Sequence, residues 1–186
     1  NIAIGHDTLG ATTTGGFNTA VGNSSLDVNT TGASNIAIGD TALGANTTAS
    51  YNTAIGTSAL AANTTGAENT AVGYAALDAN TGSNNTAVGS YALQKLTDGN
   101  FNTAIGAYSL QNNTGGTYNT AIGSKALWQN RLGNYNTAIG ADALVNSSQG
   151  EFNTAIGYQS LFNNSSGDNN VAIGYQAGSN NKGSNF

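Results

Sequence analysis

Side chains that could perform acid-base, nucleophilic or metal chemistry are few in this chain, and they do not gather. The only histidine, His6, has Asp7 beside it and lies in the first copy of a repeated pattern. The nine acidic residues fall at unrelated positions, so neither a general acid-base pair nor a calcium-binding series emerges. Cysteine is absent, which excludes a disulfide framework. We therefore predict that the protein is not an enzyme and holds neither a metal nor a cofactor.

Aromatic residues, by contrast, recur at a regular spacing. Six of them directly precede an Asn-Thr-Ala-Ile-Gly-like pentad: Phe17, Tyr51, Phe101, Tyr118, Tyr135 and Phe152. In one interpretation the rings stack as a structural ladder that adds burial to a thin core or a subunit seam. In the other, the last four rings form a strip that contacts sugar rings. Five more tyrosines could extend that strip: Tyr74, Tyr91, Tyr108, Tyr158 and Tyr175.

Sequons for N-linked glycans, Asn-x-(Ser/Thr), are also frequent. Their asparagines are Asn23, Asn29, Asn46, Asn63, Asn84, Asn112, Asn146, Asn163 and Asn164. Most fall in expected outer turns, where a glycan has room. The alternative is that Asn and Thr are simply the residue types that turns require. Glycans would explain how a chain with only 7% charged residues stays soluble.

An internal repeat positions all of these residues. The pentad Asn-(Thr/Ile/Val)-Ala-(Ile/Val)-Gly occurs eleven times, at intervals of 17 residues except for one interval of 16. We number each repeat from its pentad asparagine, which is position 0. These asparagines are Asn1, Asn18, Asn35, Asn52, Asn69, Asn85, Asn102, Asn119, Asn136, Asn153 and Asn170. A unit this small cannot bury its own apolar side chains, so the period predicts a solenoid.

Within each repeat, the alternation over positions +1 to +4 predicts a strand that ends at the +4 glycine. A second short strand is expected at +7 and +8, where a small residue precedes a leucine. The Ile/Val at +3 and the Leu at +8 are expected to stack as two interior ladders, as in Ile55, Leu60, Ile105, Leu110, Ile122 and Leu127. Asparagines at positions 0 and +11 are expected to form amide ladders that satisfy backbone groups of the turns.

The predicted fold is an all-β, parallel β-helix or β-roll solenoid of about eleven 17-residue coils. With coils ~4.8 Å apart, the rod is roughly 50 Å long. It covers residues 1–178, and residues 179–186 are expected to be a fraying or connecting segment. The core is lean and the Ala/Gly side of the strand is small enough for close approach. We therefore expect self-association through that side, as a homotrimer or an end-to-end filament. Threonine rows at +1 and at +12 and +13 also suggest an ice-binding face, but they are interrupted and one is expected to be packed.

The pentads at residues 1–5 and 170–174 resemble the head repeat of trimeric autotransporter adhesins, the YadA-like left-handed parallel β-roll. The full unit, such as residues 52–66, is similar to the NTAIG-type repeats of phage and viral tail-fibre proteins and bacterial surface-fibre proteins. The resemblance covers nearly the whole chain and implies a left-handed, trimeric roll. Two departures are the longer period and the threonine at +1, where the adhesins favour an apolar residue.

These observations together predict a non-enzymatic, extracellular structural fibre or adhesin rod on a cell or virion surface. Its partners are copies of itself, with cell-surface glycans or a host receptor in addition. One alternative is the shaft of a phage or viral tail fibre, and another is a carbohydrate-binding module that uses the aromatic column. A net charge of −5 with four Lys/Arg argues against nucleic acid. No run approaches the ~20 apolar residues of a membrane helix, so this segment is not expected to contact a membrane.

Overall fold

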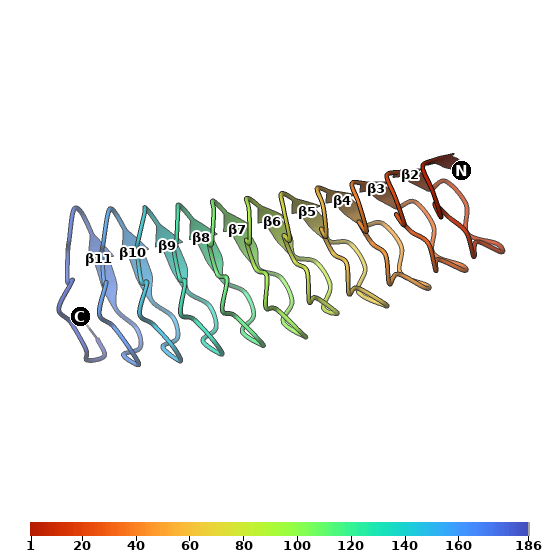
Figure 1. Cartoon of the computed structure of the whole chain (residues 1–186). Coiled ribbons are helices and arrows are strands. Elements are labelled where there is room, and N and C mark those ends of the chain that lie inside the picture. The colour runs from red at the N-terminus through yellow and green to blue at the C-terminus, as the bar shows by residue number, and fades with distance from the viewer. Residues whose placement is uncertain (186) are drawn as a thin grey trace.

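The computed structural model describes residues 1–185, which form one rod of stacked coils (Figure 1). Its strands are β1 (Ile2–Ile4), β2 (Thr19–Val21), β3 (Ile36–Ile38), β4 (Thr53–Ile55), β5 (Thr70–Val72), β6 (Thr86–Val88), β7 (Thr103–Ile105), β8 (Thr120–Ile122), β9 (Thr137–Ile139), β10 (Thr154–Ile156) and β11 (Val171–Ile173). They make one parallel 11-stranded sheet in chain order. Equivalent residues pair across every step, including the shortened one, where Thr70 faces Thr86. The predicted all-β solenoid is confirmed.

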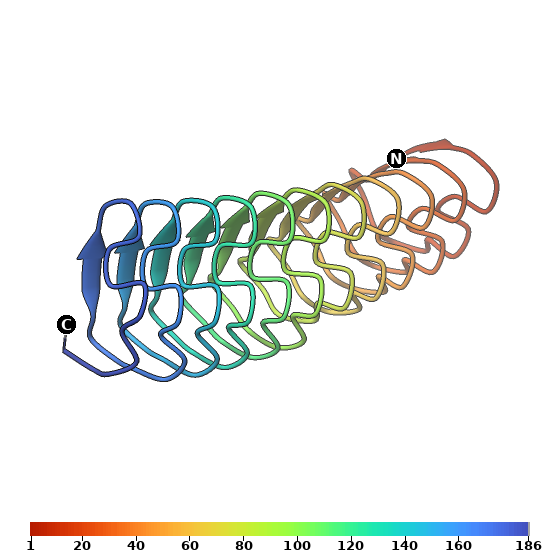
Figure 2. The ribbon, with the colours of Figure 1, turned by 60° about the vertical axis from the view of Figure 1, so that its left-hand side comes forward.

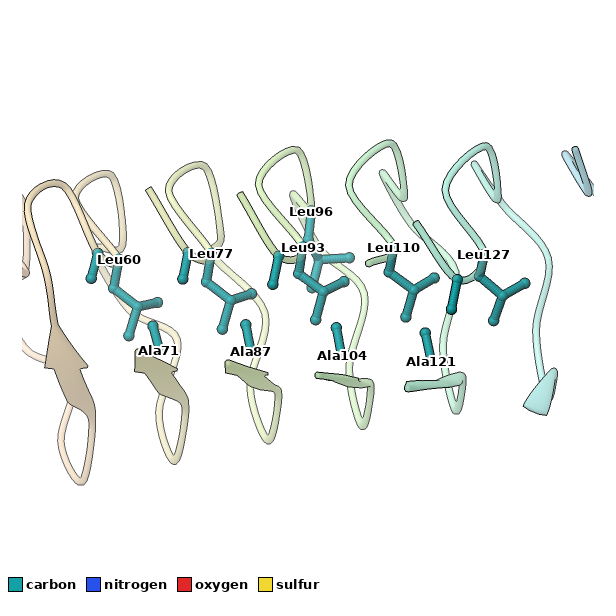
Figure 3. Packing of buried hydrophobic residues seen from close by; sticks show 14 of the residues in the cluster. Leu60, Ala71, Leu77, Ala87, Leu93, Leu96, Ala104, Leu110, Ala121 and Leu127 are labelled. Carbon is teal, nitrogen blue, oxygen red and sulfur yellow. The ribbon is translucent and has the colours of Figure 1, made fainter. Parts of the chain in front are cut away.

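The interior of the second to tenth coils is filled by the alanine at +2 and the leucine at +8. Ala104 and Leu110, for example, are fully buried. Figure 3 shows the successive leucines pointing the same way, toward the strand alanines. The residues at +3 point outward, and Ile55, Ile105 and Ile122 are 36 to 40% exposed. The prediction that these three belong to an interior ladder is therefore wrong, as is the idea of an exposed Ala/Gly side.

The width of the coil explains this reversal. The leucine reaches across from the turn to the strand, so only a methyl group fits opposite it. Residues two apart in an extended strand point to the same side, so the asparagine at position 0 lies on the same side as the alanine at +2. The asparagine amide has to lie inside the coil to bond buried backbone groups. Positions +1 and +3 are then outside. The sequence does hold a signal for this arrangement, because +2 is alanine in all eleven repeats whereas +3 varies between Ile and Val.

Two columns of buried asparagine hold successive turns together, as predicted. At position 0, Asn102 Oδ1 accepts a hydrogen bond from Asn119 N at 3.0 Å, and Asn102 Nδ2 donates to Gly116 O at 2.9 Å. At position +11, Asn113 Oδ1 accepts from Gly116 N at 2.7 Å. One column therefore links adjacent coils and the other closes the turn within a coil. Backbone groups that no strand could pair are satisfied in this way.

The second strand predicted at +7 and +8 does not form. The chain makes consecutive turns there, with Tyr108 and Leu110 in the left-handed region at φ 61° and 49°. Asn113 N donates to Leu110 O at 3.0 Å within the turn, and Leu110 N donates to Ala126 O of the next coil at 2.9 Å. Coil-to-coil hydrogen bonds are therefore kept, but alternating left-handed residues prevent an extended strand.

Irregular repeats are absorbed in the turns. In the shortened repeat, Asn80 Nδ2 donates to Gly82 O, two residues ahead, whereas Asn130 Nδ2 reaches Gly133 O, three residues ahead. Asn181 Nδ2 of the eleventh coil also donates two residues ahead, to Gly183 O. In the next coil Leu96 replaces the +11 asparagine and is fully buried. Residues 179–185, predicted to fray or connect, close the eleventh coil, and Asn185 N donates to Asp168 O at 2.9 Å. Residue 186 of that predicted segment lies outside the described residues.

One coil carries Ser147 in place of the +11 asparagine, and its buried hydroxyl has no hydrogen-bond partner. Asparagine in the preceding coil, Asn130, accepts from Gly133 N at 3.1 Å and donates to Gly133 O at 3.0 Å. Ser147→Asn should restore this pair of bonds at Gly150 and raise the free energy of unfolding by about 1 kcal/mol. Denaturant unfolding measures the change. Ser148→Asn, one residue along and partly exposed, is the control and should not stabilise.

Candidate functional site

The outward face of the sheet carries three parallel columns of side chains, at positions −1, +1 and +3. Strand geometry directs the +1 and +3 side chains to the same side. The −1 residue lies two positions before the strand, with φ 57° at Phe101. Figure 2 shows the strands lined up along one side of the rod. From Phe101 to Ile156 these columns contain only Phe, Tyr, Thr and Ile, with no charged residue. Ile105 is 40% exposed and Tyr118 is 48% exposed. Exposed apolar patches on a protein surface are candidates for interaction sites.

The aromatic column is a stack of rings, and it unites Phe101, Tyr118, Tyr135 and Phe152 as predicted. Neighbouring ring centroids are 5.0 Å apart, and the planes lie within 6° of parallel. Each inner ring therefore has another ring over both of its faces, which leaves no room for a sugar ring to lie flat between two of them. About half of each side chain remains exposed, mainly along the edges. This geometry favours the structural ladder over the sugar-binding strip.

The other predicted aromatic residues do not extend this ladder. They form two groups at the corner after the strand, Tyr74, Tyr91 and Tyr108 in one and Tyr158 with Tyr175 in the other, with centroids 5.2 to 5.6 Å apart. Within residues 1–185 no ring contact joins either group to the ladder. Among the described residues, Phe17 and Tyr51 stack on no other ring, because Ser34 lies between them in the column and Glu68 follows Tyr51. Desolvation is the main cause that raises the pKa of Tyr91, and the neighbouring Tyr74 and Tyr108 raise it further.

The two threonine columns differ in what their hydroxyls do. At +12 the hydroxyl donates to the equivalent carbonyl of the next coil, as from Thr97 Oγ1 to Thr114 O at 2.8 Å. At +1, seven consecutive coils carry a partly exposed threonine, from Thr53 to Thr154. None of those seven hydroxyls bonds another group of the described chain. The +1 column therefore offers an in-register row of hydroxyls to solvent or to a partner.

The nine sequon asparagines divide into two groups. Four lie at position +11 and are fully buried: Asn29, Asn46, Asn63 and Asn164. Their Nδ2 atoms donate hydrogen bonds inside the coil, so a glycan there would require the turn to open. The prediction that these four lie in glycan-accessible turns is wrong. The remaining five are wholly or partly exposed and stay candidates: Asn23, Asn84, Asn112, Asn146 and Asn163.

Titratable groups are dispersed over the described part of the chain. His6 Nδ1 lies 2.9 Å from Asp7 Oδ2 in an exposed pair. Burial raises the pKa of Asp78, a single carboxyl on the turn side of its coil. Residues 1–185 bring no three metal-ligating side chains together. They also contain no helix long and apolar enough to cross a membrane.

Comparisons of the chain with protein-family models, with curated proteins and with solved structures gave no match. Functional assignment therefore rests on the surfaces of the rod. The strongest feature is the uncharged sheet face, with its ring ladder, its row of unbonded threonine hydroxyls and its exposed Ile/Val column.

Proposed function

We propose that this chain is a non-enzymatic structural rod of an extracellular fibre or adhesin, and that copies of it associate through the outward face of the sheet. The observation that carries the proposal is the exposed apolar surface between Phe101 and Ile156. An aromatic side chain can bury ~150–250 Å². Four half-exposed rings therefore offer a few hundred Å², and the isoleucine column adds to this. Such an area approaches the ~800 Å² per partner of a stable interface.

A second copy of the chain fits this face for three reasons. The face has no charge, so two copies do not repel each other. Its columns repeat once per coil, so one favourable contact recurs over the four coils from Phe101 to Ile156 when two copies lie in register. The +1 threonine hydroxyls can also bond across such a contact. A trimer about the rod axis closes the arrangement and leaves no copy of the face exposed.

The alternatives differ in how well the geometry supports them. A tail-fibre shaft would use the same rod and the same face, so it differs from an adhesin only in what is attached to the rod. A carbohydrate-binding module using the aromatic column is less well supported, because the rings cover one another. The +1 threonine row favours one further candidate, an ice-binding face. That function needs the face to be free and therefore needs a monomer.

The chain contains no cysteine, so single-cysteine variants test the proposed interface cleanly. Oxidised Ile105→Cys protein should form covalent dimers at micromolar concentration, because the proposed contact brings this column of two copies together. Asn112→Cys, on the turn side, is the control and should remain uncrosslinked. Electrophoresis without reductant reads the result. Equal crosslinking of both variants would mean random collision and would count against this face.

A further inference from the structure

Cationic side chains gather on one edge of the rod although the chain carries a net charge of −5. Positions +10 and +12 hold Lys95, Arg131 and Lys182, which are three of the four Lys/Arg residues. None of the nine carboxylates lies at either position. This edge belongs to the turn side of the coil, so it stays open when the sheet face is covered by another copy.

Two of these cations share a groove of about 250 Å³ that crosses three successive coils. Its lining residues are Lys95, Asn112, Thr114, Gln129 and Arg131. An adjoining hollow of about 340 Å³ continues past Arg131 to Ser148 and Gln149. Apart from the two cations, the groove is lined by amides and a hydroxyl. Polar, shallow and donor-rich surfaces of this kind suit a hydroxylated ligand better than an apolar one.

Position +13 of the three coils that the groove crosses holds Asp98, Gly115 and Leu132. A Cβ on Gly115 would lie 3.2 Å from Asp98 Oδ1 and 3.5 Å from Leu132 Cδ2, so these two side chains close over the glycine. None of the three residues lines the groove itself.

The two cations are placed to hold separate anionic groups. Lys95 Nζ donates to Asn112 Oδ1 at 2.9 Å, which orients the ammonium and leaves its other protons for a ligand. The Arg131 guanidinium bonds no carboxylate within residues 1–185, and both side chains are exposed. They lie two coils apart, or ~9.6 Å along the rod axis at the inter-strand spacing. Two sugar rings of an extended polysaccharide cover a similar length.

We propose that this groove binds an acidic polysaccharide with one carboxylate per disaccharide. One carboxylate pairs with Lys95, the next pairs with Arg131, and the hydroxyls between them bond Asn112 and Gln129. The sparse charge excludes nucleic acid, whose duplex carries one phosphate charge per ~1.7 Å and needs a much denser basic surface. The site does not depend on self-association, since it lies on the other side of the coil.

The probe is a hexasaccharide of alternating glucuronate and N-acetylglucosamine, and the neutral comparison is an N-acetylglucosamine hexamer of equal length. Titration calorimetry at low salt should show binding of the acidic fragment alone. Arg131→Gln should weaken it at least tenfold. Lys125→Gln removes the same charge from position +6, outside the groove, and should leave the affinity unchanged. Asp98→Asn, which removes a carboxylate three residues along the chain from Lys95, should strengthen binding because it removes a repulsion for an anionic ligand.

Three results would overturn the proposal: no binding by the unmodified protein, equal binding of the neutral hexamer, or equal loss in Lys125→Gln and Arg131→Gln. The last would show that overall charge, and not the groove, attracts the ligand. Molar mass and unfolding curves on the same samples keep a loss of binding distinct from a loss of assembly or of folding.

Discussion

Asn102→Ala should lower the free energy of unfolding by about 3 kcal/mol. The substitution leaves Asn119 N buried without a partner, which costs ~1–3 kcal/mol. It also removes one of the two hydrogen bonds to Gly116 O, the other of which comes from Asn113 Nδ2 at 3.2 Å. It also opens a small void, because Asn102 is 1% exposed. Denaturant unfolding at one fixed protein concentration measures the loss, since any self-association would make the midpoint depend on concentration.

Asn112→Ala is the matched control for this prediction. Asn112 is the same residue type, ten positions along the same coil, but it is partly exposed and accepts one hydrogen bond, from Lys95. Its removal should cost about 0.5 kcal/mol or less, as is usual for surface substitutions. Similar losses for the two variants would mean that the buried amide column does not hold the coils together.

Gly106→Ala should be comparably damaging, with a loss of about 4 kcal/mol or failure to fold. Gly106 has φ +128°, and an added Cβ would lie 2.7 Å from both the carbonyl carbon and oxygen of Gly123 in the next coil. Neither backbone atom can move without separating the two coils, and a left-handed conformation alone costs an L-residue ~1–2 kcal/mol. Thermal unfolding followed by circular dichroism gives the effect.

Gly16→Ala is the control for the glycine prediction. A Cβ at Gly16 would meet nothing within 4 Å, and its φ is not in the left-handed region. It should be neutral or stabilise by up to about 1 kcal/mol, since alanine restricts the unfolded chain. If Gly106→Ala unfolded like Gly16→Ala, the close stacking of the corners would be contradicted.

The period was the part of the fold that the sequence predicted best. Identical residues 17 apart had to stack, and the pairing of Thr103 with Thr120 confirms it. Alternation along the strand places Ala104 on the same side as Asn102, and Ile105 on the same side as Thr103, but it does not say which side faces the interior. Hydrophobicity alone predicts that Ile105 faces the interior. The coil is too narrow for this, and Ala104 faces the interior instead. The width of the coil depends on the position of Leu110, which has a left-handed backbone at φ 49°. Leucine is not a residue type that predicts this conformation.

The surfaces show a similar division. Stacking of Tyr118 on Tyr135 followed from the period alone. The period did not predict which asparagines a glycan can reach. Asn112 and Asn113 are neighbours of the same residue type, but Asn112 lines a groove and Asn113 is buried. Only the hydrogen bonds of the turn distinguish them. The groove could have been found by aligning the repeats, which places Lys95 at +10 and Arg131 at +12 of nearby coils.

We propose above that the apolar residues outside the coil form a contact between copies of the chain. Molar mass by light scattering at micromolar concentration measures whether such a contact forms. The unmodified protein should have a multiple of the 18.5 kDa chain mass, three times for the closed trimer. The mass should fall to that of a folded monomer when Ile105 and Ile122 are both changed to lysine. An unmodified protein that scatters as a stable 18.5 kDa monomer would contradict the proposal.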